Sequence, residues 1–183
     1  YLVGGAGQPA YGDVISPPDE TPLAAGDVLM LDTGACRDGY FCDFDRNFAI
    51  GSADERAFAA HRTLYAATDA GLAAARPGAT CADVFQAMAT MIADAGSIKE
   101  SGDGDVGRLG HGLGMQLTEA PSLTGFDQTV LEAGMVLTLE PSLSIAPGAM
   151  MVHEENIVVR DGPPQLLSTR VPPDRPVIGG LIG

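Results

Sequence analysis

The pattern of apolar and polar residues predicts a strand-rich first part, two helices and a strand-rich last part. An apolar run over Val28–Leu31 ends on Asp32, and an aromatic-rich run with a period of two covers Tyr40–Ile50. The turn-forming residues Arg37–Gly39 lie between these runs, so the pattern predicts a β-hairpin. Residues 1–26 are rich in Gly and Pro, which predicts strand and loop.

Two Ala-rich segments with helix-start signals follow the hairpin. Ser52–Glu55 has the form of a capping box, which predicts a helix that ends near Arg76–Gly78. Thr80 is the candidate N-cap of a second helix, which should run to about Ala95 and end at Gly96. One helix pair is therefore expected in the middle of the chain.

Three further apolar runs predict strands around and after a glycine-rich stretch over residues 101–114. These runs cover Leu113–Leu117, Met135–Glu140 and Met150–Val159. The tail from residue 168 to residue 183 is rich in Pro and Gly and should be extended over the surface. Two helices followed by several antiparallel strands indicate an α+β domain.

Length and charge narrow the function classes. A chain of 183 residues suits one domain with a sizeable core, and a net charge of −14 makes nucleic acid and anionic membrane poor partners. No apolar stretch is long enough to span a bilayer. Three cysteines, Cys36, Cys42 and Cys81, lack a disulfide or zinc-ribbon pattern, so we expect free thiols and a cytoplasmic location. The chain starts on Tyr1, and we expect it to be a fragment of a longer protein.

Acidic residues stand where apolar strands end. Asp32 and Asp43 are eleven residues apart, and a turn centred on residues 37 and 38 would place them opposite each other. A two-residue turn at Asp38–Gly39 would instead pair Asp32 with Asp45. Carboxylates that face each other destabilise a strand pair unless a cation lies between them. The alternative is that both are solvated residues at the ends of a loop. The hairpin alone supports the two interpretations about equally.

One histidine and three further acids could join such a site. His111 has glycine on both sides, which allows close approach of the backbone. Glu140 ends one apolar run, and Glu154 and Glu155 begin another, where a charged side chain needs a partner. Each acid alone favours a structural ion pair with a nearby arginine, namely Arg108, Arg160 or Arg170. The five residues Asp32, Asp43, His111, Glu140 and Glu154 together favour a metal centre.

In order and spacing, these residues resemble the pita-bread metallopeptidases, which include prolidase, aminopeptidase P and methionine aminopeptidase. The matching segments are Leu31–Gly34, Asp43 with Arg46, Gly110–Gly114, Thr138–Pro141, and Glu154, which follows Glu140 by fourteen residues. That spacing favours Glu154 over Glu155. The resemblance covers nearly the whole chain. It implies a pita-bread fold, an antiparallel sheet covered by helices, here without the first helix pair. Residues 1–183 would be the C-terminal catalytic domain, without the N-terminal domain.

The resemblance implies a dinuclear metal-dependent hydrolase of the Xaa-Pro peptidase type, which acts as a homodimer in the cytoplasm. Asp43 and Glu154 would bridge two divalent cations, Asp32 would bind one of them, and His111 and Glu140 the other. Four carboxylates carry the four negative charges that two such cations cancel. Manganese is the first expectation, and cobalt, zinc or iron also suit these ligands. A bridging water would attack the amide carbonyl, with Glu140 and His111 as the catalytic residues and Glu140 as the proton acceptor.

The sequence departs from the family where substrate is bound. The peptidases carry a histidine at the position of Thr118, before Glu119, and a second one in the region that corresponds to residues 11–17, where this chain has none. Thr118 and Glu119 are therefore candidate substrate-binding residues, for a small peptide or another small molecule. A two-metal hydrolase or lyase of a non-peptide metabolite and a non-catalytic binding module are the alternatives. His153 should point to the other face of its strand from Glu154, and His61 should be structural.

Overall fold

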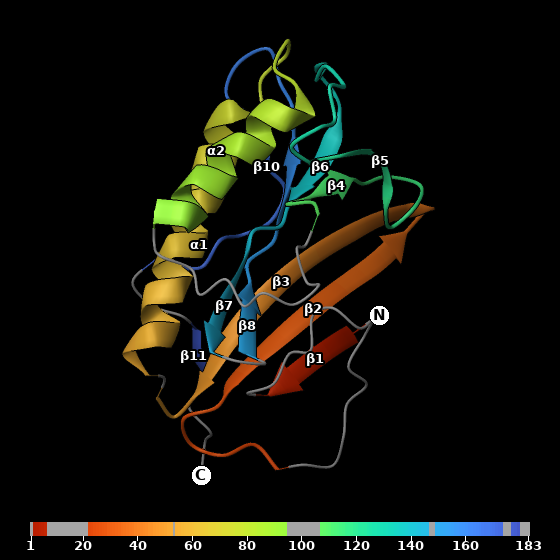
Figure 1. Ribbon diagram of the computed structural model, residues 1–183. Helices are drawn as coiled ribbons and strands as arrows, with labels where there is room; N and C mark the ends of the chain where they lie inside the picture. Colours follow the sequence, from red (N-terminus) through yellow and green to blue (C-terminus); the bar gives the residue numbers. More distant parts are fainter. Residues whose placement is uncertain are drawn as a thin grey trace.

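The computed structural model describes residues 2–6, 22–52, 54–94, 107–146, 149–173 and 177–179. Its helices are α1 (Glu55–Ala74) and α2 (Cys81–Asp94), which form the expected helix pair (Figure 1). Its strands are β1 (Leu2–Ala6), β2 (Val28–Arg37), β3 (Tyr40–Ile50), β4 (His111–Gly112), β5 (Glu119–Ser122), β6 (Val136–Leu139), β7 (Ser142–Ala146), β8 (Ala149–Val152), β9 (Glu155–Val158), β10 (Gln165–Leu166) and β11 (Val177–Gly179).

The predicted hairpin is confirmed as β2 and β3, and its turn fixes the register. Arg37 pairs with Tyr40, so the turn has only two residues, Asp38 and Gly39, with φ of 54° and 88°. Positive φ at both positions is the backbone of a type I′ turn, which matches the twist of paired strands. Asp32 therefore pairs with Asp45. The turn centred on residues 37 and 38 was wrong, and the two-residue alternative is confirmed.

The strands form two larger sheets and one separate pair. The first sheet has the order β1-β2-β3-β11, in which β11 runs parallel to β3 and the other pairs are antiparallel. The second has the order β10-β9-β6-β4-β5, and β7 pairs with β8. In Figure 1 the long hairpin runs along one side of the molecule, and β4 and β5 lie near its turn end. A backbone hydrogen bond of 2.8 Å from Phe41 to Gly114 joins the two there.

Side chains of the chain itself cap the start of each helix. The N-cap of α1 is Asp54, which accepts a hydrogen bond of 2.8 Å from the Ala57 N–H, so the cap lies two residues beyond the predicted Ser52. Thr80 and Asp83 form the second cap reciprocally, because each side chain accepts from the backbone N–H of the other. The predicted end of α2 at Ala95 and Gly96 lies outside the described residues.

The two helices cover one face of the second sheet and form the main core with it. The core residues include Val84 and Met88 from α2 and Leu137, Leu139 and Ile157 from β6 and β9, all fully buried. Each such side chain contributes about 1.5–3 kcal/mol by leaving water. This packing fixes β6 and β9 against the helices, and β9 also contacts β3 of the hairpin. Within the described residues, neither helix combines the length and the apolar character of a membrane span.

Two of the predicted strands differ from the observed ones. Leu113–Leu117 is a series of bends between β4 and β5, in which the Gly114 N–H donates to the Gln116 carbonyl. Apolar residues there gave a false strand signal, because the chain turns back on itself over so short a distance. The run Met150–Val159 is interrupted at residues 153 and 154, where the chain passes from the β7–β8 pair to the second sheet.

Candidate metal centre

One face of β3 carries a set of acidic side chains. Alternation along β3 directs Asp43 and Asp45 to the same face. Asp32 lies opposite Asp45 on β2, and Gly34 lies opposite Asp43, where it adds no side chain. Glu154 approaches from the segment before β9. The hairpin register therefore places three carboxylates together, and the chain crossing from β8 to β9 brings the fourth.

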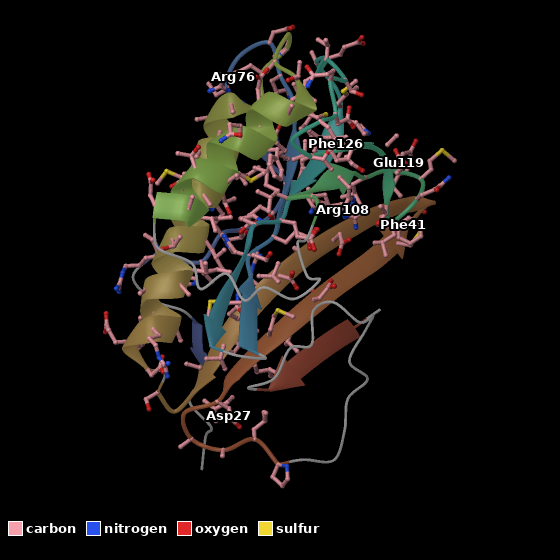
Figure 2. All side chains as sticks on the ribbon, in the orientation of Figure 1. Asp27, Phe41, Arg76, Arg108, Glu119 and Phe126 are labelled. Atoms are coloured by element: carbon pink, nitrogen blue, oxygen red, sulfur yellow. The ribbon has the colours of Figure 1, made fainter. Side chains whose placement is uncertain are left out.

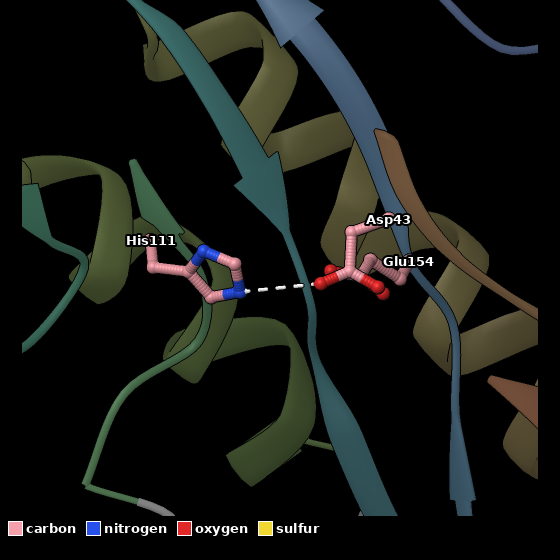
Figure 3. Close-up of side chains that lie close together, drawn as sticks. All are labelled: Asp43, His111 and Glu154. Carbon is pink, nitrogen blue, oxygen red and sulfur yellow. Dashed lines mark ion pairs between the residues drawn. The ribbon is translucent and has the colours of Figure 1, made fainter. Parts of the chain in front are cut away.

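Two groups of side chains are close enough to share a cation. Asp43, His111 and Glu154 each offer a ligand atom, and these atoms lie within 4.8 Å of one another (Figure 3). Asp32, Asp45 and Glu154 meet the same criterion. Glu154 belongs to both groups, and five described side chains thus surround one small volume.

Glu140 lies at the edge of this volume. It follows β6 directly, and its Oε2 atom is 4.0 Å from His111 Nε2, while Asp43 Oδ2 is 3.8 Å from the same nitrogen. Its side chain is 12% exposed, against 2% for His111. The structure therefore brings all five predicted ligand residues together and adds Asp45 to them.

His111 has a fixed orientation and an available ring nitrogen. Its Nδ1 lies 2.9 Å from the Gly112 carbonyl, which can only accept, so Nδ1 carries the proton and Nε2 keeps its lone pair toward the acids. Burial lowers the pKa of His111, although the bond to Gly112 works against this. A neutral imidazole with Nε2 directed into a cluster of carboxylates is the form that binds a metal.

Gly110 explains how the backbone reaches this position. Its φ is +143°, and a Cβ atom there would lie 2.2 Å from the Thr138 carbonyl oxygen. The His111 N–H next to it donates to the Thr138 hydroxyl at 3.1 Å. The glycine therefore lets the His111 segment lie directly against β6, close to Glu140.

Without bound cations, the burial of these carboxylates lowers the stability of the fold. Asp45 is 0% and Glu154 1% exposed, and among the described residues both Asp45 oxygens and Glu154 Oε1 have no hydrogen-bond partner. Burial, and then the charges of the neighbouring acids, raise the pKa of both Asp45 and Glu154. Buried carboxylates without partners are stable only if protonated or bound to cations. Oxygen-rich ligands with one neutral imidazole fit divalent cations.

An ion-pair network around Arg46 lies next to the cluster and holds the backbone at Glu154. Arg46 donates to the Glu154 carbonyl at 3.0 Å, to Glu155 Oε2 at 3.1 Å and to the Thr169 carbonyl at 3.0 Å. Burial works to raise the pKa of Glu155, but bonds from His153 and Ser168 and the charge of Arg46 outweigh it, so the net shift is downward. Glu155 therefore belongs to this network, while its neighbour Glu154 faces the cluster.

The other two histidines lie on the helix side of the sheet. His153 Nδ1 is 3.0 Å from the Thr68 hydroxyl, and the His153 ring stacks on Tyr65, both in α1. This confirms that His153 points away from the face of Glu154. His61 is buried in α1 with Nε2 3.5 Å from the Pro172 carbonyl, as expected for a structural residue.

Thr118 and Glu119 lie at the turn end of the hairpin. Thr118 is exposed, and the Glu119 carboxylate accepts a hydrogen bond of 3.1 Å from the Gln116 N–H. Figure 2 places Glu119 near Phe41. Neither residue belongs to the two ligand groups of the described chain. Their role in substrate binding stays a prediction.

A separate cavity near the hairpin has none of the ligand residues in its described lining. It has a volume of about 400 Å³ and is lined by residues that include Cys42, Phe44 and Arg46. These alternate along β3 with Asp43 and Asp45, so the cavity opens on the opposite face of the strand. Leu113 and Leu167 complete its mainly apolar lining.

Sequence reasoning named Asp45 only as a possible cross-strand partner of Asp32 and not as a ligand. The signal was the Asp38–Gly39 dipeptide, which is typical of a two-residue hairpin turn. That turn fixes the register, and with it the place of Asp45 beside Asp32.

Comparisons with known proteins agree with this geometry. The profile described as metallopeptidase family M24 matches residues 6–161. The chain is 33% identical over 148 residues to the putative dipeptidase YkvY of Bacillus subtilis, with 79% of this chain and 39% of that protein covered. It is 30% identical over 178 residues to the Xaa-Pro dipeptidase of Pyrococcus furiosus, with 90% and 49% covered.

Solved structures give the same result for the fold. The dipeptidase PepE of Mycobacterium ulcerans superposes with a TM-score of 0.84 at 27% identity, over 97% of this chain and 46% of that one. The prolidase of Pyrococcus furiosus gives 0.81 at 25% identity, over 93% and 49%. The chain thus spans less than half the length of these relatives. The fold is the pita-bread fold, and the chain belongs to metallopeptidase family M24.

Proposed function

We propose that the protein is a dinuclear metal-dependent hydrolase of the Xaa-Pro dipeptidase type. The observation that carries the proposal is the cluster of Asp32, Asp43, His111, Glu140 and Glu154, three of them buried and Asp32 and Glu140 half-buried. It offers oxygen ligands and one neutral imidazole. Its relatives include proteins named Xaa-Pro dipeptidase and prolidase. Family membership and ligand chemistry therefore support the same activity.

The ligand set divides between two cation positions. Asp43 and Glu154 would help to hold both cations, Asp32 would help to hold one of them, and His111 and Glu140 the other. Two divalent cations, when bound, lower the pKa of a water ligand and polarise the amide carbonyl. Four carboxylates balance the charge of these cations, and manganese is the proposed metal because oxygen ligands predominate.

The chain's own residues would prepare and complete the reaction. Glu140, at the more exposed edge of the cluster, takes the proton of the attacking water and returns it to the amine that leaves. His111 stays neutral and oriented by its bond to the Gly112 carbonyl. Arg46 holds the backbone of Glu154 in place through its carbonyl. The assignment of residues 1–183 to a C-terminal catalytic domain, the homodimer and the cytoplasmic location belong to the same proposal.

A second candidate is a two-metal hydrolase or lyase of a small non-peptide metabolite. It is favoured by Thr118, an exposed residue where the resembling peptidases carry a histidine. A non-catalytic binding module is disfavoured, because the chain retains every acid of the ligand set in a buried position or at its edge.

The test is turnover of Gly-Pro and Ala-Pro by the full-length, manganese-loaded protein, with released proline measured by a colorimetric assay. We expect proline release that disappears in Asp43→Ala and persists in the control Asp69→Ala, whose side chain is 53% exposed on α1. If the loaded protein binds its metal but releases no proline, the peptidase proposal is overturned. If Asp43→Ala keeps both metals, the ligand assignment is wrong.

A further inference from the structure

Asp45 is the most deeply buried acid of the cluster. Its exposure is 0%, and neither carboxylate oxygen has a hydrogen-bond partner among the described residues. Arg46 does not neutralise it directly, because the guanidinium donates to the Asp45 backbone carbonyl, at 2.7 Å. A carboxylate in this condition destabilises the fold unless something absent from the polypeptide binds it.

The direction of the side chain shows where that partner would lie. A ligand oxygen of Asp45 lies within 4.8 Å of ligand oxygens of both Asp32 and Glu154. Asp32 is its cross-strand partner, so two carboxylates face each other directly on the ladder. Such a pair is unfavourable by itself and favourable around a shared cation.

We propose that Asp45 is a direct ligand of the cation on the Asp32 side, a sixth ligand residue beyond the five that the resemblance implies. This inference rests on the two-cation centre of the proposed function. Besides Asp43 and Glu154, which serve both positions, the Asp32 side then has Asp32 and Asp45 and binds through oxygen alone. The other side has the imidazole of His111 together with Glu140.

The two positions consequently differ in chemistry. An all-carboxylate position favours a hard cation such as Mn²⁺, and a position with an imidazole also suits softer cations such as Zn²⁺ or Co²⁺. With Asp45 the cluster holds five carboxylates against two divalent cations, so the loaded centre has one negative charge in excess. That excess strengthens cation binding and makes the metal-free centre less stable.

The competing explanation is that Asp45 remains protonated and takes no part in binding. The two explanations differ in what Asp45→Asn does, because the amide keeps the shape of the side chain and removes the charge. A ligand role predicts weaker Mn²⁺ binding together with a more stable metal-free protein. A protonated bystander predicts no change in either quantity.

The experiment is isothermal titration of Mn²⁺ into metal-free protein, combined with thermal unfolding of the metal-free and loaded forms. For Asp45→Asn we expect one of the two Mn²⁺ ions to bind at least tenfold more weakly. We also expect a higher Tm without metal and a smaller Tm rise with it. The control is Asp38→Asn, the same change in the same hairpin at a side chain that is 89% exposed, and it should behave as wild type. If Asp45→Asn does not fold, Asp45→Ser must give the same loss of one ion.

The outcomes separate this inference from the proposed function. If Asp45→Asn binds two Mn²⁺ ions with wild-type affinity, the ligand role is overturned and the peptidase proposal is untouched. If wild type binds two ions, Asp45→Asn loses one, and no proline is released from dipeptides, the proposed activity is overturned and the ligand role is supported. If wild type binds no Mn²⁺, both are overturned.

Discussion

Replacing Arg46 with methionine tests how the fold holds the metal cluster in place. Arg46 and Glu155 form an ion pair of 3.1 Å whose side chains are 13% and 0% exposed. Removing one partner of a buried pair costs about 3–5 kcal/mol, because the other charge is left without compensation. Glu155 keeps its contacts with His153 and Ser168, so we expect the lower value, about 3 kcal/mol.

Urea unfolding of the metal-free protein measures this cost. With a slope of about 2 kcal/mol/M, a loss of about 3 kcal/mol lowers the midpoint by about 1.5 M at unchanged slope. The control is Arg62→Met, because the Arg62–Glu55 pair is 53% and 83% exposed, and its loss should cost less than about 1 kcal/mol.

A double variant identifies the mechanism. Adding Glu155→Gln to Arg46→Met removes the uncompensated charge, so it should recover about half or more of the lost stability, on the order of 1.5 kcal/mol. Arg46→Met should also weaken Mn²⁺ binding, because Arg46 holds the Glu154 carbonyl at 3.0 Å. If the midpoint of Arg46→Met moves no further than that of Arg62→Met, the buried Arg46–Glu155 pair does not stabilise the fold.

Three further predictions concern the surroundings of the cluster. Gly110→Ala forces a Cβ atom to within 2.2 Å of a carbonyl oxygen of β6. It should lower the free energy of unfolding by about 3 kcal/mol and weaken Mn²⁺ binding. The control Gly134→Ala, with φ of +98° and open space around the new Cβ, should lower it by only about 1 kcal/mol, as measured by urea unfolding. Leu139→Ala leaves a cavity at a fully buried core position and should lower the free energy of unfolding by about 2–5 kcal/mol. The control Leu167→Ala, at a residue that is 52% exposed, should lower it by less than about 0.5 kcal/mol. Equal losses for the two variants would contradict the assigned core. Burial, followed by the charge of His153, lowers the pKa of His61. Below about pH 6.5 the unfolded chain therefore binds more protons than the folded one, and the free energy of unfolding falls on acidification by up to about 1.4 kcal/mol per pH unit. His61→Gln should remove this contribution of His61 from the pH dependence of unfolding.

Much of the fold follows from local sequence signals. The hairpin, the two helices and β6 were predicted because strand periodicity, capping residues and turn residues act over a few neighbours. The predicted boundaries were wrong where the sequence offers two equally acceptable local signals. Ser52 and Asp54 are both acceptable N-caps, and only Asp54 is in place to accept from the Ala57 N–H. The apolar run at Leu113–Leu117 resembles a strand, but the chain has to turn there to bring β5 beside β4.

The sequence predicts which residues form the site better than it predicts how those residues are arranged. Spacing relative to a known family identified Asp43, His111 and Glu154, which the fold brings together from segments far apart in the chain. The part played by Asp45 depends on the register of one hairpin, where a shift in the turn exchanges the residue opposite Asp32. That register is decided by the backbone angles at residues 38 and 39, which the sequence left open between two turns.

In the proposed function, the clustered carboxylates and His111 form a two-cation centre. The most direct measurement is the metal content of the Mn²⁺-loaded protein after exhaustive dialysis, by elemental analysis, paired with its Tm before and after chelation. We expect two ions per chain and a marked fall in Tm on chelation, because ligands at about 100 times their Kd stabilise by about 2.7 kcal/mol per site. A protein that retains no metal and unfolds at the same temperature with and without chelator would contradict the two-cation centre.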